Sequence, residues 1–243
     1  MKGWVLEAKW GDGASAQRTV SIKAGGNNMR AECPEWGNEK YLIDAGQKVT
    51  YAVTIREFED GTKQAAADKY PWSVMDRTRR TNVDDAVQMD RMRSRLSDLS
   101  AEEREAATAS AKALEAMKSA ATLEVSEETK KFGDYDCVKY NLTQGDKVKA
   151  VVWVAKGLKV DAPVWGMVGH TLELSMGGLP VLAQLDGMEA GFPLRVNLEY
   201  VGFRHGQKYD RKLNFWIEKV AQADLDVAEI QLPRNAQVSD AMH

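Results

Sequence analysis

Apolar and polar residues alternate with a period of two along the first quarter of the chain. The alternating stretches cover positions 4–10, 20–22, 29–33, 41–44 and 49–55, and glycine-rich turns separate several of them. A period of two with one apolar side is the pattern of strands that bury one face and expose the other. The pattern predicts an antiparallel meander at the start of the chain.

The middle of the chain has a different pattern. Met92, Leu96 and Leu99 follow one another at helical spacing, and Ser100 and Glu103 form a capping box. We therefore predict two helices, at about 84–99 and 101–122. The polar tract before them, 57–72, is interpreted as a long loop.

The strand pattern returns after position 125. The stretch from Gly133 to Gly157 predicts a β-hairpin with a turn at 144–146, and its second strand turns four residues toward a covered side: Val148, Ala150, Val152 and Val154. Next we expect an irregular segment that runs into a strand at 170–176, and a short helix begun by Pro180. Two strands should follow at 194–200 and 209–217, and the end from 227 onward should be extended and exposed.

This order predicts the α+β class, with a curved, mostly antiparallel sheet. The helix pair and the short helix would cover its concave face, as in a half-barrel. The 243 residues, 44% of them hydrophobic, suffice for one large core. We predict a single domain over 1–243 with a helical insert at about 84–123.

Charge and hydropathy exclude some classes of protein. The net charge of −3 argues against nucleic-acid binding, which requires a basic surplus. No apolar run reaches bilayer-spanning length, so no transmembrane segment is expected. The chain begins without a signal-peptide pattern, which is compatible with a cytoplasmic protein or with an exported one whose signal was removed.

Candidate chemistry is sparse. The three histidines lie at position 170, at the start of a predicted strand, at 205 in a turn, and at 243. No nucleophile elbow, zinc motif or calcium loop is present. We expect no enzyme activity, no cofactor and no metal, and leave a catalytic site around His170 as the weaker alternative.

Tryptophan and methionine are the more informative residues. The chain has 7 Trp and 10 Met, and methionine adapts to irregular apolar cavities. Such residues either fill the space between sheet and helices or line the rim of a hydrophobic cleft. The candidate ligand contacts are Trp153, Trp165, Met167 and Met176.

Several segments together resemble a known bacterial family. They are "GWVLEAKWGDG", "NNMRAEC", "KYLIDAGQKVTYAV", "FGDYDCVKYNLTQGDKVKAVVWVAKGL", "GFPLRVNLEY" and "AEIQLPRNAQVSD". In their order and spacing they resemble exported domains of unknown function whose fold is similar to the periplasmic lipoprotein carriers LolA and LolB. The resemblance implies a half-barrel around an apolar cavity and a periplasmic or cell-envelope location. It carries over no catalytic residue.

Two functions remain open from the sequence. The leading hypothesis is a non-enzymatic envelope protein that binds a lipid, an acyl chain or a lipidated partner such as a lipoprotein. The alternative is a structural or interaction protein of the envelope, with a core filled by its own side chains and a protein partner.

The two cysteines, Cys33 and Cys137, form a disulfide only if their side chains meet. Cys33 shares the dry face of its strand with Met29 and Ala31, whereas Cys137 alternates with apolar residues and falls on the wetter face. Free thiols are therefore favoured. A β-bulge near Gly133 would shift the phase and permit the bridge, which export would also favour.

Overall fold

The structure is a computed structural model, and it describes residues 1–12, 18–72, 100–101, 120–145, 148–176, 180–204 and 207–240. Its strands are β1 (Lys2–Asp12), β2 (Arg18–Gly25), β3 (Asn28–Glu32), β4 (Glu39–Asp44), β5 (Val49–Glu57), β6 (Lys63–Pro71), β7 (Ala121–Phe132), β8 (Tyr135–Gln144), β9 (Val148–Lys156), β10 (Gly191–Arg204), β11 (Gln207–Asp224) and β12 (Gln237–Asp240). Its described helices are α3 (Val164–Met176), α4 (Val227–Ile230) and the 3₁₀ turns η1 (Pro34–Trp36) and η2 (Pro180–Leu185).

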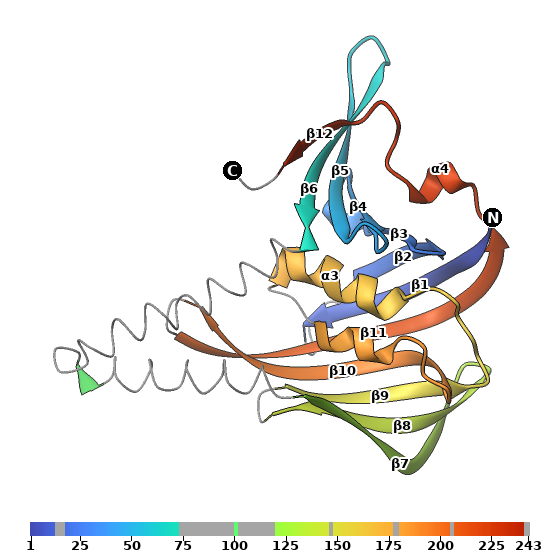
Figure 1. Cartoon of the computed structure of the whole chain (residues 1–243), viewed down its shortest axis with the longest axis vertical. Coiled ribbons are helices and arrows are strands. Elements are labelled where there is room, and N and C mark those ends of the chain that lie inside the picture. The colour runs from blue at the N-terminus through green and yellow to red at the C-terminus, as the bar shows by residue number, and fades with distance from the viewer. Residues whose placement is uncertain are drawn as a thin grey trace.

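All twelve strands belong to one sheet, in the order β12-β6-β5-β4-β3-β2-β1-β11-β10-β9-β8-β7 (Figure 1). Neighbouring strands are antiparallel except that β12 runs parallel to β6. The predicted fold class, α+β with a half-barrel, is therefore wrong. The sheet is mixed and does not close into a barrel, and strands make up most of the described residues. The long meander β2–β6 extends the sheet past β1 instead of curling back toward β7, and β12 lengthens it further.

The sheet has an inner face, which we define as the face that α3 covers, and an opposite outer face. Register places Leu6 opposite Ile22 and Val196 opposite both Val152 and Phe215, so their side chains share the inner face. Most of the largest buried hydrophobic cluster lies there, and α3 and η2 contribute to it. Strand residues of this cluster alternate with more exposed ones, as a sheet with one buried face requires.

A second, smaller core lies on the outer face of β4–β6. Its buried members are Leu42, Val53, Ala65 and Ala67, and Leu232 and Ala236 of the C-terminal segment pack against it. The segment between β11 and β12 thus covers part of the outer face. The sequence predicted this end as exposed, which is wrong for the part that forms the second core.

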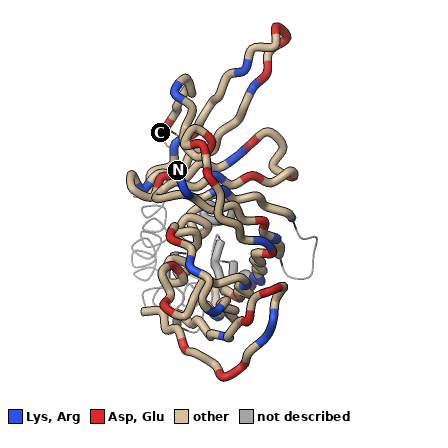
Figure 2. The backbone as a smooth tube through the Cα atoms, turned by 90° about the vertical axis from the view of Figure 1, so that its right-hand side faces the viewer, with Lys and Arg blue, Asp and Glu red and all other residues tan. Residues whose placement is uncertain are grey.

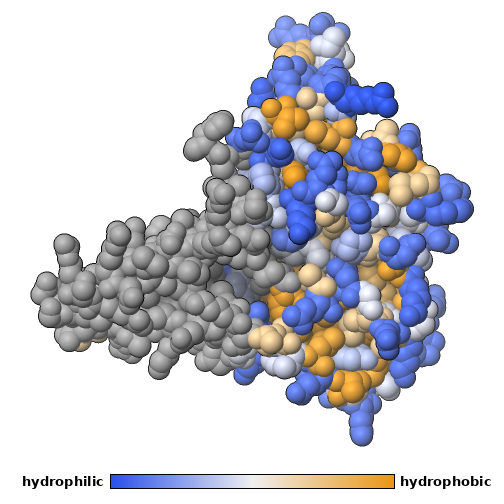
Figure 3. All heavy atoms as spheres, in the orientation of Figure 1, coloured by the Kyte–Doolittle hydropathy of each residue, from blue (hydrophilic) through white to orange (hydrophobic). Residues whose placement is uncertain are grey.

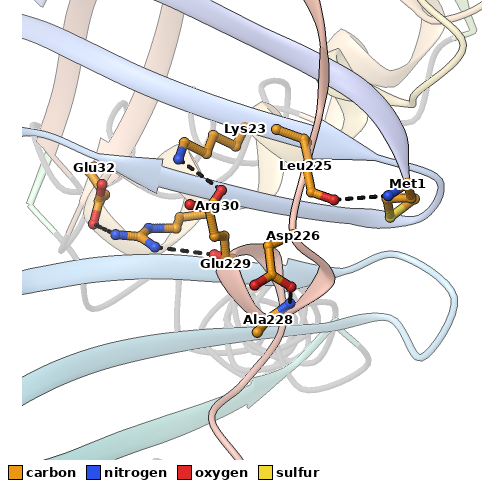
Figure 4. A network of polar contacts seen from close by, with 8 residues as sticks. All are labelled: Met1, Lys23, Arg30, Glu32, Leu225, Asp226, Ala228 and Glu229. Carbon is orange, nitrogen blue, oxygen red and sulfur yellow. Dashed lines mark hydrogen bonds and ion pairs between the residues drawn. The ribbon is translucent and has the colours of Figure 1, made fainter.

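Polar contacts fix this C-terminal segment to the sheet (Figure 4). The Lys23 ammonium pairs with the Glu229 carboxylate at 2.9 Å, and Arg30 donates to the Glu229 carbonyl at 3.2 Å. Asp226 caps α4, because its carboxylate accepts a hydrogen bond from the Ala228 amide at 3.0 Å. These contacts hold α4 against β2 and β3.

Other predicted elements have mixed outcomes. The hairpin is confirmed as β8 and β9, and the short helix begun by Pro180 is confirmed as η2. The predicted loop at 57–72 contains β6, and the predicted irregular segment and strand up to 176 form α3, so both predictions are wrong. The helix predicted at about 84–99 and most of that at 101–122, and hence the helical insert, lie outside the described residues; β7 begins at Ala121. The single-domain extent stays a prediction.

Candidate functional site

Helix α3 fills the middle of the inner face. The side chains of Trp165 and Met167 are 0% exposed. The Trp165 ring meets Phe215 edge-on, with ring centroids 5.2 Å apart, and lies tilted against Phe192 at 6.4 Å. Both residues are core residues in this conformation, and a ligand would reach them only after α3 moved.

The start of α3 is held by a carboxylate from η2's C-terminal side. Asp186 accepts hydrogen bonds from the backbone amides of Trp165, at 2.8 Å, and Gly166, at 2.6 Å. A carboxylate at this position satisfies two of the amides that a helix N-terminus leaves without partners. A Cβ at Gly166 would lie 3.0 Å from the Asp186 carboxylate, so glycine allows this close approach. Burial raises the pKa of Asp186 to about 6, although both amide hydrogen bonds lower it.

His170 lies on α3 and not at the start of a strand. Its ring stacks on Trp72, with centroids 3.7 Å apart and an interplanar angle of 13°. The Trp72 indole in turn donates to the Thr50 hydroxyl at 3.0 Å, and Thr50 is fully buried. This arrangement uses His170 to pack α3 against β5 and the end of β6.

The inner face is less completely covered near β7. Register pairs Leu123 with Leu142 and Val125 with Tyr140, which places an apolar row on the two last strands. Leu142 is buried, Leu123 and Tyr140 are half-buried, and Val125 is 66% exposed. In Figure 3 hydrophobic residues lie among charged ones over the part of the molecule where Figure 1 shows β7–β9.

The outer face of β7–β11 carries a group of four residues that we call the aromatic cluster: Phe132, Trp153, Arg195 and Trp216. Arg195 of β10 pairs in register with Trp153 of β9 and with Trp216 of β11. Its guanidinium lies 4.0 Å from the centroid of Phe132 and 5.1 Å from that of Trp216. Trp153 meets Phe132 edge-on at 5.4 Å. All four residues are partly exposed, so the cluster is part of the surface.

The side chain of Asn197 and the buried thiol of Cys137 lie on the same face as the aromatic cluster. The Trp216 indole donates to the Asn197 side-chain oxygen at 2.9 Å, which fixes the ring. Cys137 is fully buried on this face, and burial raises its pKa. Cys137 therefore lies on the face opposite Cys33, as predicted, but it is not solvated. Both cysteines are free in the structure.

Some of the cations around the aromatic cluster form ion pairs with carboxylates, and others do not. Lys139 is bonded to Glu128 at 2.7 Å and Lys9 to Glu218 at 3.0 Å. Arg195 and Lys130, whose ammonium lies 5.3 Å from the Phe132 centroid, have no carboxylate within ion-pair distance among the residues that the structure describes. Elsewhere Lys and Arg are interspersed with Asp and Glu along the backbone (Figure 2).

The similarity of this chain to known proteins is weak. No family model matches the chain, and no curated protein does either. Two solved structures of PNGF-II, in space groups C2 and P21, cover 100% of the chain at 12% and 10% identity, with TM-scores of 0.42 and 0.39. The chain spans 32% of the length of PNGF-II.

A LolA superfamily protein from Nitrosomonas europaea covers 95% of the chain and is itself covered to 90%, at 11% identity and a TM-score of 0.29. Structural similarity at TM-scores below 0.5 carries no argument about the fold or function of this chain.

The structure does not bring the four predicted ligand residues together. Trp165 and Met167 belong to α3 and are buried, Trp153 is on the outer face, and the side chain of Met176 lies outside the described residues. As ligand contacts they stay a prediction. The sequence did not predict Phe132, Arg195 or Trp216 as site residues. One signal was available, because Arg195 and Trp216 lie on the polar side of their strands, whose apolar side carries Val196, Leu198, Phe215 and Ile217.

Within the described residues no helix is long and apolar enough to cross a bilayer, and no group of three His, Cys, Asp or Glu side chains could hold a metal ion.

Proposed function

We propose that this chain is a non-enzymatic interaction protein of the cell envelope, with an inner face filled by its own helix and a protein partner on its outer face. The observation that carries the proposal is the complete burial of two side chains of α3, Trp165 and Met167. Because α3 occupies the middle of the inner face, a partner has access to the outer face first. The envelope location follows the sequence resemblance to exported proteins.

The composition of the outer face supports a protein partner. Aromatic residues and arginine are enriched at protein interfaces, and tryptophan and arginine are among the residues that contribute most to binding energy there. The aromatic cluster holds all three types within ring-contact distance of one another. Rings that are already fixed by neighbours lose little conformational freedom when a partner binds.

Native mass spectrometry of the purified chain, before and after cross-linking in its native envelope, tests the proposal. We expect the mass of the chain without a bound amphiphile, and a single stoichiometric protein complex after cross-linking. A co-purifying lipid and no protein complex would contradict the proposal.

A second function has an observation of its own. The partly exposed apolar row of Leu123, Val125 and Tyr140 offers an acyl chain or a lipidated segment an apolar surface on the inner face, and burial of each methylene would contribute about 0.8 kcal/mol. Under this hypothesis Val125→Asp should abolish binding of a fatty-acid probe. Thr122→Asp, on the opposite side of the same strand, should leave it unchanged.

A further inference from the structure

Arg195 is the most unusual cation on the surface of this protein. Its guanidinium lies over two aromatic rings, and no described residue accepts a hydrogen bond from it. A guanidinium has five N–H donors around its edge, and stacking on rings leaves that edge available. Held between β9 and β11, the group is orientated before any ligand arrives.

The charges near Arg195 indicate which chemical group the edge of its guanidinium would bind. Arg195 and Lys130 both lie over the Phe132 ring, and neither has a carboxylate within ion-pair distance among the described residues. Nearby Lys139 and Lys9 each have one, and Glu218, the partner of Lys9, acts on Arg195 only at longer range. Two cations without a directly bonded carboxylate, beside partly exposed rings, favour an anionic group attached to an apolar one. A planar carboxylate matches the guanidinium edge in a bidentate manner.

We infer that the aromatic cluster binds a carboxylate-bearing segment of a protein partner, in which an Asp or Glu side chain bonds Arg195 while apolar neighbours pack on Trp153 and Trp216. This inference rests on the proposed function and specifies its surface. An extended segment fits because adjacent strands place Trp153, Arg195 and Trp216 in one row across the sheet. In such a segment alternate side chains face the same way.

Fluorescence anisotropy with two labelled probes tests the inference. One probe is a short peptide of alternating Leu and Glu, and the other is the same peptide with Gln in place of Glu. We expect the Glu peptide to bind at least about tenfold more tightly, because a carboxylate forms a stronger, charge-assisted hydrogen bond with a guanidinium than a neutral amide does. Arg195→Gln should remove the difference, and Arg195→Lys should restore only part of it.

Lys63→Gln is the matched control. Lys63 is an exposed cation at the other end of the sheet, paired with Glu57 at 3.2 Å, and its loss should leave both affinities unchanged. If Arg195→Gln fails to fold, Lys130→Gln provides the same comparison and should reduce the preference for Glu.

Equal affinity for the two peptides, or an unchanged preference in the Arg195 variant, would overturn the inference. So would displacement of the Glu peptide by inorganic phosphate at equal concentration, because the site would then bind any anion. If a stoichiometric partner is found by mass spectrometry but the peptides fail, the proposed function stands and the partner uses another surface. If a lipid and no partner is found, the proposed function itself fails.

Discussion

The two faces of the sheet use tryptophan in opposite ways. Trp165 on the inner face is 0% exposed and touches Phe215 and Phe192, so its whole ring serves packing. Trp153 on the outer face is partly exposed and touches Phe132 beside a stacked arginine. The difference shows that aromatic content alone does not locate a binding surface. Trp165 lies on the helix that covers the inner face, whereas Trp153 lies beside two cations that have no carboxylate within ion-pair distance among the described residues.

The largest expected effect is the difference between Trp165 and Trp153 in their contribution to the free energy of unfolding. Trp165→Ala should lower the free energy of unfolding by about 3–5 kcal/mol, because it removes a fully buried ring and leaves a cavity. Trp153→Ala should cost about 1 kcal/mol, the size of an aromatic pair. Urea unfolding followed by circular dichroism measures both values. Equal losses would show that the two faces do not differ as described.

The next effect concerns the attachment of α3. Burial raises the pKa of Asp186 to about 6, above the ~3.9 of an unfolded chain. Between these values the folded state holds a proton that the unfolded state has released. The free energy of unfolding should therefore fall by about 2–3 kcal/mol as the pH rises from about 4 to 6.

Asp186→Asn isolates this contribution, because asparagine does not titrate and its oxygen still accepts an amide hydrogen bond. Unfolding curves of both proteins across this pH range should show a smaller decline for the variant. A decline identical in the two proteins would contradict the assignment.

The sequence predicted much of the difference between the two faces of the sheet. Alternation placed Val148 to Val154 on the covered face and separated the faces of Cys33 and Cys137, because a period of two survives in any regular strand. Alternation failed at 170–176, where α3 forms. Val164, Met167 and Val168 of the same helix have helical spacing and are buried, and a short apolar run fits both periods.

Contacts between distant segments were not predictable. Asp186 accepts from the amides of residues 165 and 166, which precede it by 21 and 20 positions, and the C-terminal segment packs on β4–β6, which lie far earlier in the chain. No local pattern encodes either contact. The aromatic cluster likewise depends on the order β11-β10-β9-β8-β7, which brings Phe132 and Trp216 to the same arginine.

A smaller effect is expected for Arg195 in the absence of a partner. Arg195→Gln should change the free energy of unfolding by less than about 1 kcal/mol, the usual contribution of a cation–π contact at a partly exposed site. Together with the predicted loss of peptide binding, this result would separate a binding role from a structural one. A loss of several kcal/mol would instead assign Arg195 to packing of the outer face.

The smallest difference between the faces is expected for the two thiols. Burial and the hydrogen bond to Glu35 raise the pKa of Cys33 to about 11, and burial raises that of Cys137. Since the thiolate is the reactive form, both should react slowly with a thiol reagent at pH 8 in the folded protein. Denaturation without reductant should release two reactive thiols per chain, and none would prove the disulfide.

The most direct test of the account is fluorine NMR of protein labelled with fluorotryptophan, with the seven signals assigned by single Trp→Phe variants. On addition of the Leu-Glu peptide, the signals of Trp153 and Trp216 should shift while that of Trp165 stays unchanged. The Leu-Gln peptide should produce neither shift at the same concentration. A shift of the Trp165 signal, with Trp153 and Trp216 unaffected, would show that ligands enter beneath α3 and would contradict the account.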